Sequence, residues 1–323
     1  MVRSLGLIAG QTAGSKTAKN GMRIGVDIGG TKVEAAILDE RNQIIRRERR
    51  PTPRGDYGAT VDLIGALVDD LEQDIGWRLP VGLGIPGCLS RATGLVKNAN
   101  STWLIGHPFD RDVEARLDRQ VRVANDADCF AISEALDGAG QGAAAVFGII
   151  LGTGVGAGLV IDGNGRQGQN GIAGEWGHNP LPWPSAEEIP GRPCYCGRTG
   201  CLETWLSGPA FEADYERETG TARDPIEIAS LVNDGEASAL AVFDRYVDRL
   251  ARGLATVVNL IDPDRIVIGG GLSNIDRLYG ELPARIARYA FTDTLSLEVV
   301  KNVHGDSSGV RGAAMLWAAG DRP

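Results

Sequence analysis

The chain has 323 residues, of which 43% are hydrophobic and 23% charged, the composition of a globular protein long enough for two domains. Its 42 acidic residues outnumber its 33 basic residues, and the formal net charge of −9 opposes binding to nucleic acid or to an anionic membrane surface. No apolar run approaches the roughly 20 residues that span a bilayer. We therefore expect a cytoplasmic protein with neither nucleic-acid nor membrane partners.

The first 21 residues differ from the rest of the chain. Residues 1–21 are rich in Gly, Ser, Thr and Ala and show no hydrophobic periodicity, and Met22 stands immediately before the first strand-like run. This segment is predicted to be a disordered extension or an overlong start of the reading frame.

Strand-like runs open the first half of the chain. Arg23–Ile28, Val33–Asp39 and Gln43–Arg49 predict an antiparallel meander, whose first two strands are joined by a Gly-Gly-Thr-Lys turn. Apolar residues recur at helical spacing between positions 56 and 75. The expected elements that follow alternate between strand and helix: Val81–Ile85, Arg111–Leu117, Val121–Ala124 and Ala127–Leu136. The small residues of Gly138–Gly142 mark the expected end of an N-terminal α/β domain, residues 22–139.

The second half repeats the opening pattern. Val146–Leu151 and Gly156–Ile161 predict another strand hairpin, around a Gly-Thr-Gly-Val-Gly turn, so the fold is expected to be internally duplicated. Glu236–Leu260 predicts a long helix with one buried face, and Arg265–Ile268 predicts a buried strand before three glycines. We expect residues 140–304 to form a larger α/β domain with a zinc-binding insertion. The C-terminal helix, residues 305–323 with its apolar part at Val310–Ala319, is expected to return to the first domain.

The two Gly-rich turns are candidate phosphate-binding loops. Backbone N–H groups of such turns can point at a phosphate, and a hydroxyl and an ammonium group can assist them. The residues expected to bind nucleotide are Asp27, Gly29, Gly30, Thr31 and Lys32 in the first turn and Gly152, Thr153 and Gly154 in the second. Each turn alone fits an ordinary hairpin equally well, whereas the pair predicts a clamp for the polyphosphate of ATP. A Rossmann loop is disfavoured because a strand, not a helix, follows the second turn.

Two further features complete the expected nucleotide site. Asp27 is a candidate ligand of Mg²⁺ through water. Gly270 and Gly271 follow a buried strand, where the absence of side chains would let an adenosine lie against the backbone; simple turn formation is the alternative.

Asn125 and Asp126 stand between a predicted strand and a predicted helix. An Asp at this place can simply be the N-cap of the helix. Phosphoryl transfer also requires a carboxylate that accepts the proton of the attacking hydroxyl, and Asp126 is the candidate for this general base.

His178, Cys194, Cys196 and Cys201 offer one imidazole and three thiolates, the ligand set of a closed structural zinc site. Buried thiols without a metal are the alternative. Glu175 lies three residues before His178, and Glu203 lies two residues after Cys201, so a metal would fix both carboxylates. Carboxylates near an imidazole suit a polyol, because they accept hydrogen bonds from sugar hydroxyls.

From about Met22 to its C-terminus the chain resembles the ROK family of repressors and sugar kinases. The segments that carry the resemblance are Asp27–Lys32, Gly84–Gly87, Asn125–Asp126, Leu151–Gly158, Gly174–His178, Cys194–Gly197, Gly200–Glu203 and Ile268–Gly271. The resemblance implies a two-domain, actin-like (ribonuclease H-like) α/β ATPase fold with an interdomain cleft, and a homodimer. It also implies that Asp126 is the catalytic base and that His178 ligates zinc through one nitrogen and contacts sugar through the other. The other implied sugar contacts are Asn100, Asn125, Glu175 and Glu203.

Within this family the chain resembles the fructokinase branch most. Lys97–Leu104, Asn179–Trp183 and His304–Gly309 carry this likeness, and the stretch between His178 and Cys194 is longer than in much of the family. The likeness implies ATP-dependent phosphorylation of D-fructose to fructose 6-phosphate, with mannose or glucose as further candidate substrates and Mg²⁺ and Zn²⁺ as cofactors.

Two alternatives remain open. An N-acetylhexosamine kinase would share the nucleotide and zinc motifs, but the bulky Trp103 and Trp183 are expected to disfavour an acetamido group. A non-catalytic, sugar-sensing ROK protein is the alternative of another class. Only about 20 unpatterned residues precede the first strand, where the repressors of the family carry a DNA-binding domain.

Overall fold

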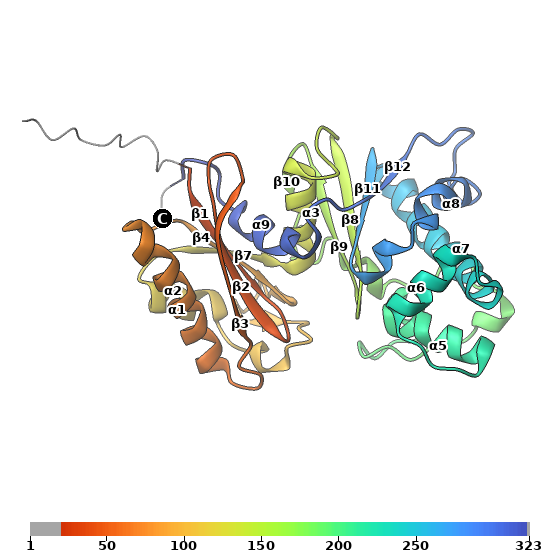
Figure 1. The fold of residues 1–323 in the computed structure, drawn as a ribbon, viewed down its shortest axis with the longest axis horizontal. Coiled ribbons are helices and arrows are strands. Elements are labelled where there is room, and N and C mark those ends of the chain that lie inside the picture. Colours follow the sequence, from red (N-terminus) through yellow and green to blue (C-terminus); the bar gives the residue numbers. More distant parts are fainter. Residues whose placement is uncertain (1–20, 322–323) are drawn as a thin grey trace, which may run out of the picture.

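The computed structural model describes residues 21–321, so nearly all of the expected N-terminal extension lies outside the described residues. Two five-stranded sheets dominate the structure, one built from each half of the chain (Figure 1). Helices lie outside both sheets and also between them. The division into domains 22–139 and 140–304 stays a prediction.

The first sheet has the strand order β3-β2-β1-β4-β7. Its strands are β1 (Arg23–Ile28), β2 (Lys32–Leu38), β3 (Ile44–Pro51), β4 (Val81–Ile85) and β7 (Val121–Asn125). β1, β2 and β3 form the expected antiparallel meander, whereas β4 and β7 run parallel to β1. Its outer face is covered by α1 (Tyr57–Ile75) and α2 (Phe109–Leu117). The Asp56 side chain caps α1, and Gly76 ends it in a left-handed conformation.

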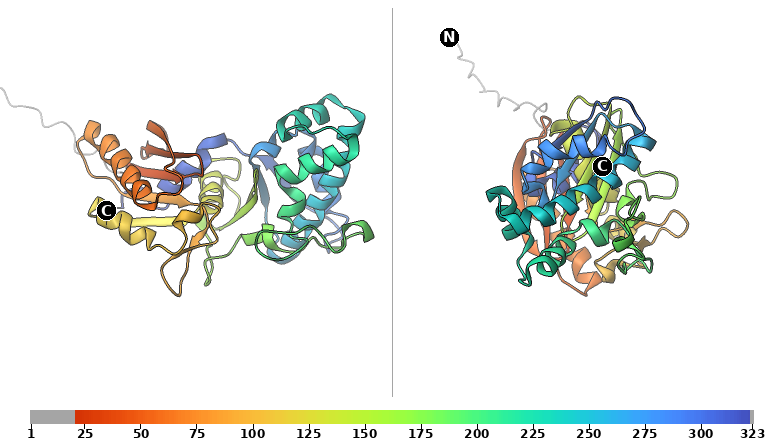
Figure 2. Two further views of the ribbon diagram at one scale, coloured as in Figure 1. Left: turned by 90° about the horizontal axis from the view of Figure 1, so that it is seen from below. Right: turned by 90° about the vertical axis from the view of Figure 1, so that its right-hand side faces the viewer.

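The second sheet repeats this arrangement in the order β10-β9-β8-β11-β12. Its strands are β8 (Ala145–Leu151), β9 (Val155–Ile161), β10 (Asn164–Gly165), β11 (Arg265–Gly269) and β12 (Glu298–Lys301). β8 and β9 form the second hairpin, and β11 runs parallel to β8. The helices on the outer side are α5 (Gly208–Thr219), α6 (Pro225–Asp234), α7 (Ala237–Ile261) and α8 (Arg277–Ile286). Figure 2 shows the two halves from below, with the orange helices of the first half at one end and the teal helices of the second half at the other.

Two helices, α3 (Asp126–Asp137) and α9 (Ser308–Ala314), pack against each other between the sheets (Figure 1). α3 contacts β8 and β9, whereas α9 contacts β1 and β4. The close approach of α9 requires glycine beneath it, because a Cβ atom at Gly25 would lie 1.9 Å from Val310 O and one at Gly82 would lie 1.8 Å from Ala313 O. The two helices thus exchange sides: α3 follows β7 of the first sheet and packs on the second sheet, whereas α9 follows β12 of the second sheet and packs on the first.

The remaining elements are short. They are β5 (Cys88–Leu89), β6 (Val96–Lys97), η2 (Thr102–Leu104), η3 (Glu175–His178), η4 (Ala186–Glu188), α4 (Glu203–Leu206), η5 (Gly271–Asn274) and η6 (Gly305–Ser307). The C-terminal helix is also shorter than the expected 305–323, because after Ala314 the backbone changes to turns in which Leu316 and Trp317 donate to carbonyls three residues back. Within residues 21–321, no helix has the length and apolar character needed to cross a membrane.

One buried carboxylate joins the two segments that connect the halves of the structure, the segment after α3 and the segment between β12 and α9. Glu134, in the last turn of α3, accepts hydrogen bonds from the N–H groups of Ala139 at 3.0 Å, Val303 at 3.1 Å and His304 at 3.2 Å. The hydroxyl of Ser308 donates to the same carboxylate at 2.7 Å. Glu134 is 0% exposed, so these donors replace its hydration.

Replacing Glu134 by Gln should lower the melting temperature by several degrees, corresponding to about 2–4 kcal/mol, because the amide NH₂ group would face buried N–H donors. Differential scanning fluorimetry measures this change. Glu218→Gln is the matched control: Glu218 is partly exposed, and its pair with Arg245 at 2.8 Å should contribute at most about 1 kcal/mol. Equal melting temperatures for the two variants would contradict the role given to Glu134.

Candidate active site

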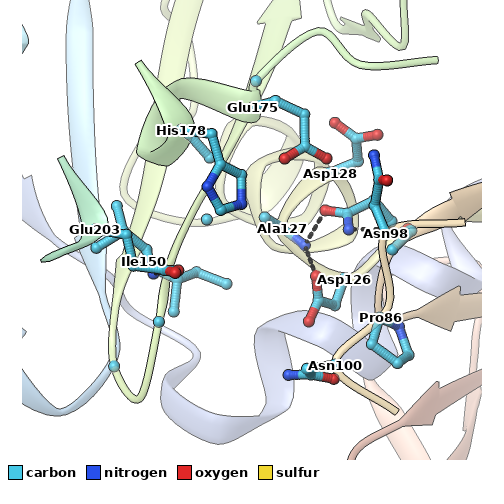
Figure 3. A pocket seen from close by; sticks show the side chains of 18 of the residues that line it. Pro86, Asn98, Asn100, Asp126, Ala127, Asp128, Ile150, Glu175, His178 and Glu203 are labelled. Carbon is cyan, nitrogen blue, oxygen red and sulfur yellow. Dashed lines mark hydrogen bonds between the residues drawn. The ribbon is translucent and has the colours of Figure 1, made fainter. Parts of the chain in front are cut away.

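A cleft between the two halves of the chain brings together all six residues predicted to act on the sugar (Figure 3). The predicted residues that line it are Asn100, Asn125, Asp126, Gly152, Thr153, Gly154, Glu175, His178 and Glu203. They come from segments far apart in the sequence and from both halves of the structure. In Figure 3, His178 and Glu203 face Asn100 and Pro86 across the cleft, with Asp126 between them.

Asp126 is the first residue of α3, and Asn125 is the N-cap. Asp126 was expected at the cap position; instead the Asn125 side chain caps the helix and accepts from Ala127 N at 2.8 Å. Asp126 Oδ1 also accepts from Ala127 N at 2.8 Å, and Asn125 Nδ2 donates to Gly87 O at 3.0 Å. The pKa of Asp126 is raised to about 6, chiefly by burial; the hydrogen bond from Ala127 opposes the rise, and the charge of Glu175 contributes to it. The Asp126 carboxylate is therefore a base matched to near-neutral pH.

Glu203 and the second Gly-rich turn hold each other in place. Glu203 Oε2 accepts a hydrogen bond from Val155 N at 2.9 Å. A Cβ atom at Gly154 would lie 2.7 Å from the same oxygen, so the contact requires glycine at that position. A residue predicted to bind sugar and a turn predicted to bind phosphate are thus in direct contact.

The imidazole of His178 faces the cysteine cluster with one nitrogen and Tyr195 with the other. His178 Nδ1 lies 3.6 Å from Cys194 Sγ, and His178 Nε2 lies 3.0 Å from the Tyr195 hydroxyl. Tyr195 lines the cleft, although the sequence analysis did not select it. The sequence could have indicated Tyr195, because it stands between Cys194 and Cys196 in a tight turn next to the predicted sugar-binding residues.

The four residues predicted to bind zinc form one cluster. The ligand atoms of His178, Cys194, Cys196 and Cys201 all lie within 4.8 Å of one another. Tetrahedral zinc with Zn–S bonds of about 2.3 Å separates its sulfur ligands by about 3.8 Å, and Cys196 Sγ lies 3.6 Å from Cys201 Sγ. The pKa of Cys196 is lowered to about 7, chiefly by a hydrogen bond from the backbone of Arg198, whereas burial raises the pKa of Cys194 and raises that of Cys201 to about 12. The support for a metal site is therefore the geometry of the cluster.

The long stretch before Cys194 is fixed by buried charges. Glu188 accepts from Arg249 Nε at 2.7 Å and from Arg252 Nη1 at 2.9 Å, and all three side chains are buried. These pairs tie the stretch to α7. The departure from the family pattern therefore has an ordered structure of its own, outside the cleft.

The first Gly-rich turn lies beside the cleft rather than in its lining. Lys32 Nζ is 3.5 Å from Asp306 Oδ2, and a Cβ atom at Gly30 would lie 3.9 Å from the Ser101 hydroxyl. Thr52 and Arg54 donate to the carbonyl oxygens of this turn at Gly29 and Gly30, and Thr52 N donates to Thr31 O at 3.0 Å. The pKa of Asp27 is raised to about 7, chiefly by burial; the negative charges of Asp126 and Glu34 contribute to the rise, and the charge of Lys32 opposes it.

Gly270 and Gly271 also lie outside the cleft lining, next to the second turn. A Cβ atom at Gly270 would lie 2.4 Å from Leu151 O, directly before Gly152. Gly152 O in turn accepts from Gly208 N at the start of α5, at 2.7 Å. The second turn, the Gly270 turn and the start of α5 thus form one backbone-rich surface.

The two tryptophans expected to obstruct an acetamido group lie elsewhere. Trp103 donates its indole N–H to Thr60 Oγ1 at 3.3 Å and packs against the core of the first half. Trp183 is 54% exposed and stacks on Tyr289 with ring centroids 5.6 Å apart. Neither side chain lines the cleft. Neither tryptophan is therefore placed to exclude an acetamido group from the cleft.

Comparisons with known proteins identify the family. The model of the ROK family matches residues 23–319. The N-acetyl-D-glucosamine kinase of Photobacterium profundum is 42% identical over 299 residues, which cover 91% of this chain and 99% of that protein. A ROK hexokinase from Thermus thermophilus has a TM-score of 0.79 at 28% identity, covering 91% of this chain and 97% of the other. A ROK family glucokinase from Streptomyces griseus, solved with glucose and AMPPNP, has a TM-score of 0.73 at 29% identity, covering 92% and 99%.

These comparisons confirm the predicted actin-like fold and correct the predicted branch. The expected fructokinase activity is wrong, because the relative that is 42% identical along nearly its whole length is an N-acetyl-D-glucosamine kinase. The segments that resembled the fructokinase branch include the two tryptophans that lie outside the cleft. With its family model matched from residue 23 to residue 319, the chain belongs to the ROK family.

Proposed function

We propose that the chain is an ATP-dependent N-acetylhexosamine kinase whose preferred sugar is N-acetyl-D-glucosamine. The observation that carries this proposal is the 42% identity to an N-acetyl-D-glucosamine kinase over 99% of that protein. The cleft supports it, because its lining combines a candidate base with several side chains that can bind hydroxyl groups.

Asp126 is the general base of the proposed reaction. Its carboxylate accepts the proton of the attacking sugar hydroxyl while the sugar oxygen forms a bond to the γ-phosphorus and the bond from phosphorus to the ADP oxygen breaks. The place of Asp126 at the start of α3 supports this role, since the backbone N–H groups of a helix N-terminus stabilise its ionised form.

The sugar is held by groups from both sides of the cleft. Glu175 and Glu203 accept hydrogen bonds from its hydroxyl groups, and Asn100 and Asn125 can both donate and accept. His178 contributes its Nε2 atom, which faces the Tyr195 hydroxyl in this structure. Because Asn125 is itself fixed by Gly87 and Ala127, its amide is already oriented for a ligand.

The nucleotide is proposed to bind across the two Gly-rich turns. Backbone N–H groups of Gly30 and Thr31 in the first turn and of Thr153 and Gly154 in the second receive the phosphates, because Gly29 N donates to Lys32 O and Gly152 N donates to Gly154 O within the turns. The Gly270–Gly271 turn lies against the adenosine. Lys32 would exchange its contact with Asp306 for a phosphate oxygen. Mg²⁺, when bound with ATP, neutralises phosphate charge, and Asp27 would hold it through water.

Zinc is proposed to be bound by His178 and the three cysteines, whose donor atoms fit a tetrahedral site. Its contribution is structural, because it joins the segment that carries Glu175 to the segment that carries Glu203. The homodimer that the family resemblance implies also stays a proposal, which sedimentation velocity would test.

The expected result of a substrate panel is a higher kcat/KM for N-acetyl-D-glucosamine than for N-acetyl-D-mannosamine, glucose, mannose or fructose. A coupled assay of ADP release with each sugar, and without sugar, measures this order. ATP consumption without sugar is the control for uncoupled hydrolysis. A higher kcat/KM for fructose, or no sugar-dependent ADP release, would contradict the proposal.

A further inference from the structure

Asp128 is a buried carboxylate near the cleft to which the proposed reaction assigns no role. It lies on α3 two residues after Asp126, is 8% exposed and lines the cleft. Figure 3 shows it beside Asn98 and Glu175, on the side of the cleft away from Glu203. Among residues 21–321, no side chain or backbone N–H donates a hydrogen bond to it, and no Lys or Arg pairs with it.

A carboxylate in this position lacks the donors that normally accompany burial. The pKa of Asp128 is raised to about 7, chiefly by burial, with smaller contributions from the charges of Asp126 and Glu175. Buried carboxylates in proteins are usually paired or hydrogen-bonded, because leaving water without a partner is unfavourable. A ligand that brings an N–H donor to this point would supply the missing partner.

A side cavity opens next to Asp128. It has a volume of about 280 Å³ and shares Asn125, Asp128 and Gly171 with the lining of the cleft. Apolar groups of Ile85, Cys88, Leu89 and Val123 form part of its wall, and the polar or charged residues Ser90, Arg91, Asp110 and Gln167 form other parts. The cavity thus combines an apolar part of its wall with Asp128, a carboxylate that has no hydrogen-bond donor among the described residues.

The small residues on this side of the cleft keep the entrance to the cavity open. Gly171 has a φ of +65°, and Gly174 has a φ of +95°. A Cβ atom at Gly174 would lie 2.2 Å from Ala157 O, and one at Gly171 would lie 3.5 Å from Leu89 O. Glycine is therefore required at Gly174 by its backbone, and no side chain at either position reduces the space near Asp128.

We propose that Asp128 and the side cavity form a subsite for the acetamido group of the sugar, with Asp128 accepting the amide N–H and the cavity receiving the methyl group. This inference rests on the proposed function. An acetamido group matches this arrangement of an acceptor next to a partly apolar cavity, since its N–H donor is separated by only two bonds from an apolar methyl group. The amide of Asn98, which lies beside Asp128, can donate to the acetyl carbonyl oxygen.

A plain hydroxyl group at the same sugar carbon fits less well. It would donate to Asp128 but would leave the apolar part of the cavity unfilled. The subsite therefore predicts discrimination between N-acetyl-D-glucosamine and glucose rather than a general effect on sugar phosphorylation.

The test compares Asp128→Leu with Asp128→Asn and measures kcat/KM for N-acetyl-D-glucosamine and for glucose. Leu removes the acceptor at similar volume, so the ratio of the two kcat/KM values should fall about tenfold or more, mainly through a higher KM for the acetamido sugar. Asn keeps an acceptor oxygen, and its ratio should stay within about threefold of the unchanged protein. Calorimetric titration with each sugar provides a readout that does not depend on turnover.

A second variant keeps the test decisive if Asp128→Leu does not fold. Cys88→Leu adds bulk to the wall of the side cavity and should lower kcat/KM for N-acetyl-D-glucosamine while changing that for glucose less than twofold. Thermal melting of each variant checks its folding.

The two proposals fail in different ways. If the unchanged protein does not phosphorylate N-acetyl-D-glucosamine, the proposed function is wrong. If it does, and both Asp128→Leu and Cys88→Leu keep the original ratio, the subsite is overturned while the proposed function stands.

Discussion

Asp126→Asn is expected to lower kcat by at least about 100-fold while sugar binding stays within a few-fold of normal. The amide has nearly the same shape as the carboxyl group but cannot accept the proton of the attacking hydroxyl. The hydrogen bond from Ala127 N can still be accepted by the amide oxygen, so the start of α3 should keep its structure. Steady-state kinetics and calorimetric binding of the sugar measure the two effects separately.

The control for this variant is Asp118→Asn. Asp118 is almost fully exposed, lies away from the cleft and ends α2 with a φ of +51°, a conformation that Asn also tolerates. Its kcat should be unchanged. An Asp126→Asn variant whose kcat is also nearly normal would remove Asp126 as the base.

The raised pKa of Asp126 adds a dependence on pH. A general base acts in its deprotonated form, so kcat/KM for the sugar should be constant above the pKa of about 6 and should fall as the pH drops below it. The limiting slope is about tenfold per pH unit if a single group controls the decline. A flat profile down to about pH 4, the ordinary value for an Asp, would show that burial does not shift the functional group.

The fold was predictable wherever one segment carries its own pattern. β1, β4 and α7 have strong local periodicity, and their predicted and observed bounds differ by at most one residue. α6 was missed, although Asp224 caps it, Pro225 begins it and Gly235 ends it, which are the usual marks of a short helix. The C-terminal helix was predicted too long, because the apolar residues continue past its end at Ala314. They lie in turns, where the Trp317 indole N–H donates to Val81 O.

In the candidate site, too, the residues within short sequence motifs were predictable and those that depend on distant segments were not. Asp126 and the cysteine cluster were predictable because their chemistry lies within short motifs. Asp128 was not predictable, because the side cavity next to it is formed by Gly171 and β5, which are distant from it in the sequence. The sugar preference was mispredicted from Trp103 and Trp183 because a sequence does not show where a side chain lies in the fold. Trp103 bonds to Thr60, Trp183 stacks on Tyr289, and neither lines the cleft.

The cysteine cluster leads to the second large expected effect. Backbone hydrogen bonds already join the segments that carry Glu175 and Glu203: Leu202 N donates to Asn179 O at 2.8 Å, and Leu181 N donates to Gly200 O at 2.9 Å. Both segments also contribute side chains to the same hydrophobic core. A metal bound by four residues would add a rigid link between them. Losing one ligand should therefore disturb metal content, stability and activity together.

Cys196→Ser is expected to reduce the zinc content from one ion per chain to well below one, to lower the melting temperature and to lower kcat/KM by about tenfold or more. Elemental analysis of protein purified without added metal gives the zinc content directly. Cys129→Ser is the matched control, because Cys129 is a buried free cysteine outside the cluster, so that variant should keep its zinc whatever happens to its stability. Zinc-free protein with full activity, or equal zinc loss in both variants, would contradict a metal site formed by His178, Cys194, Cys196 and Cys201.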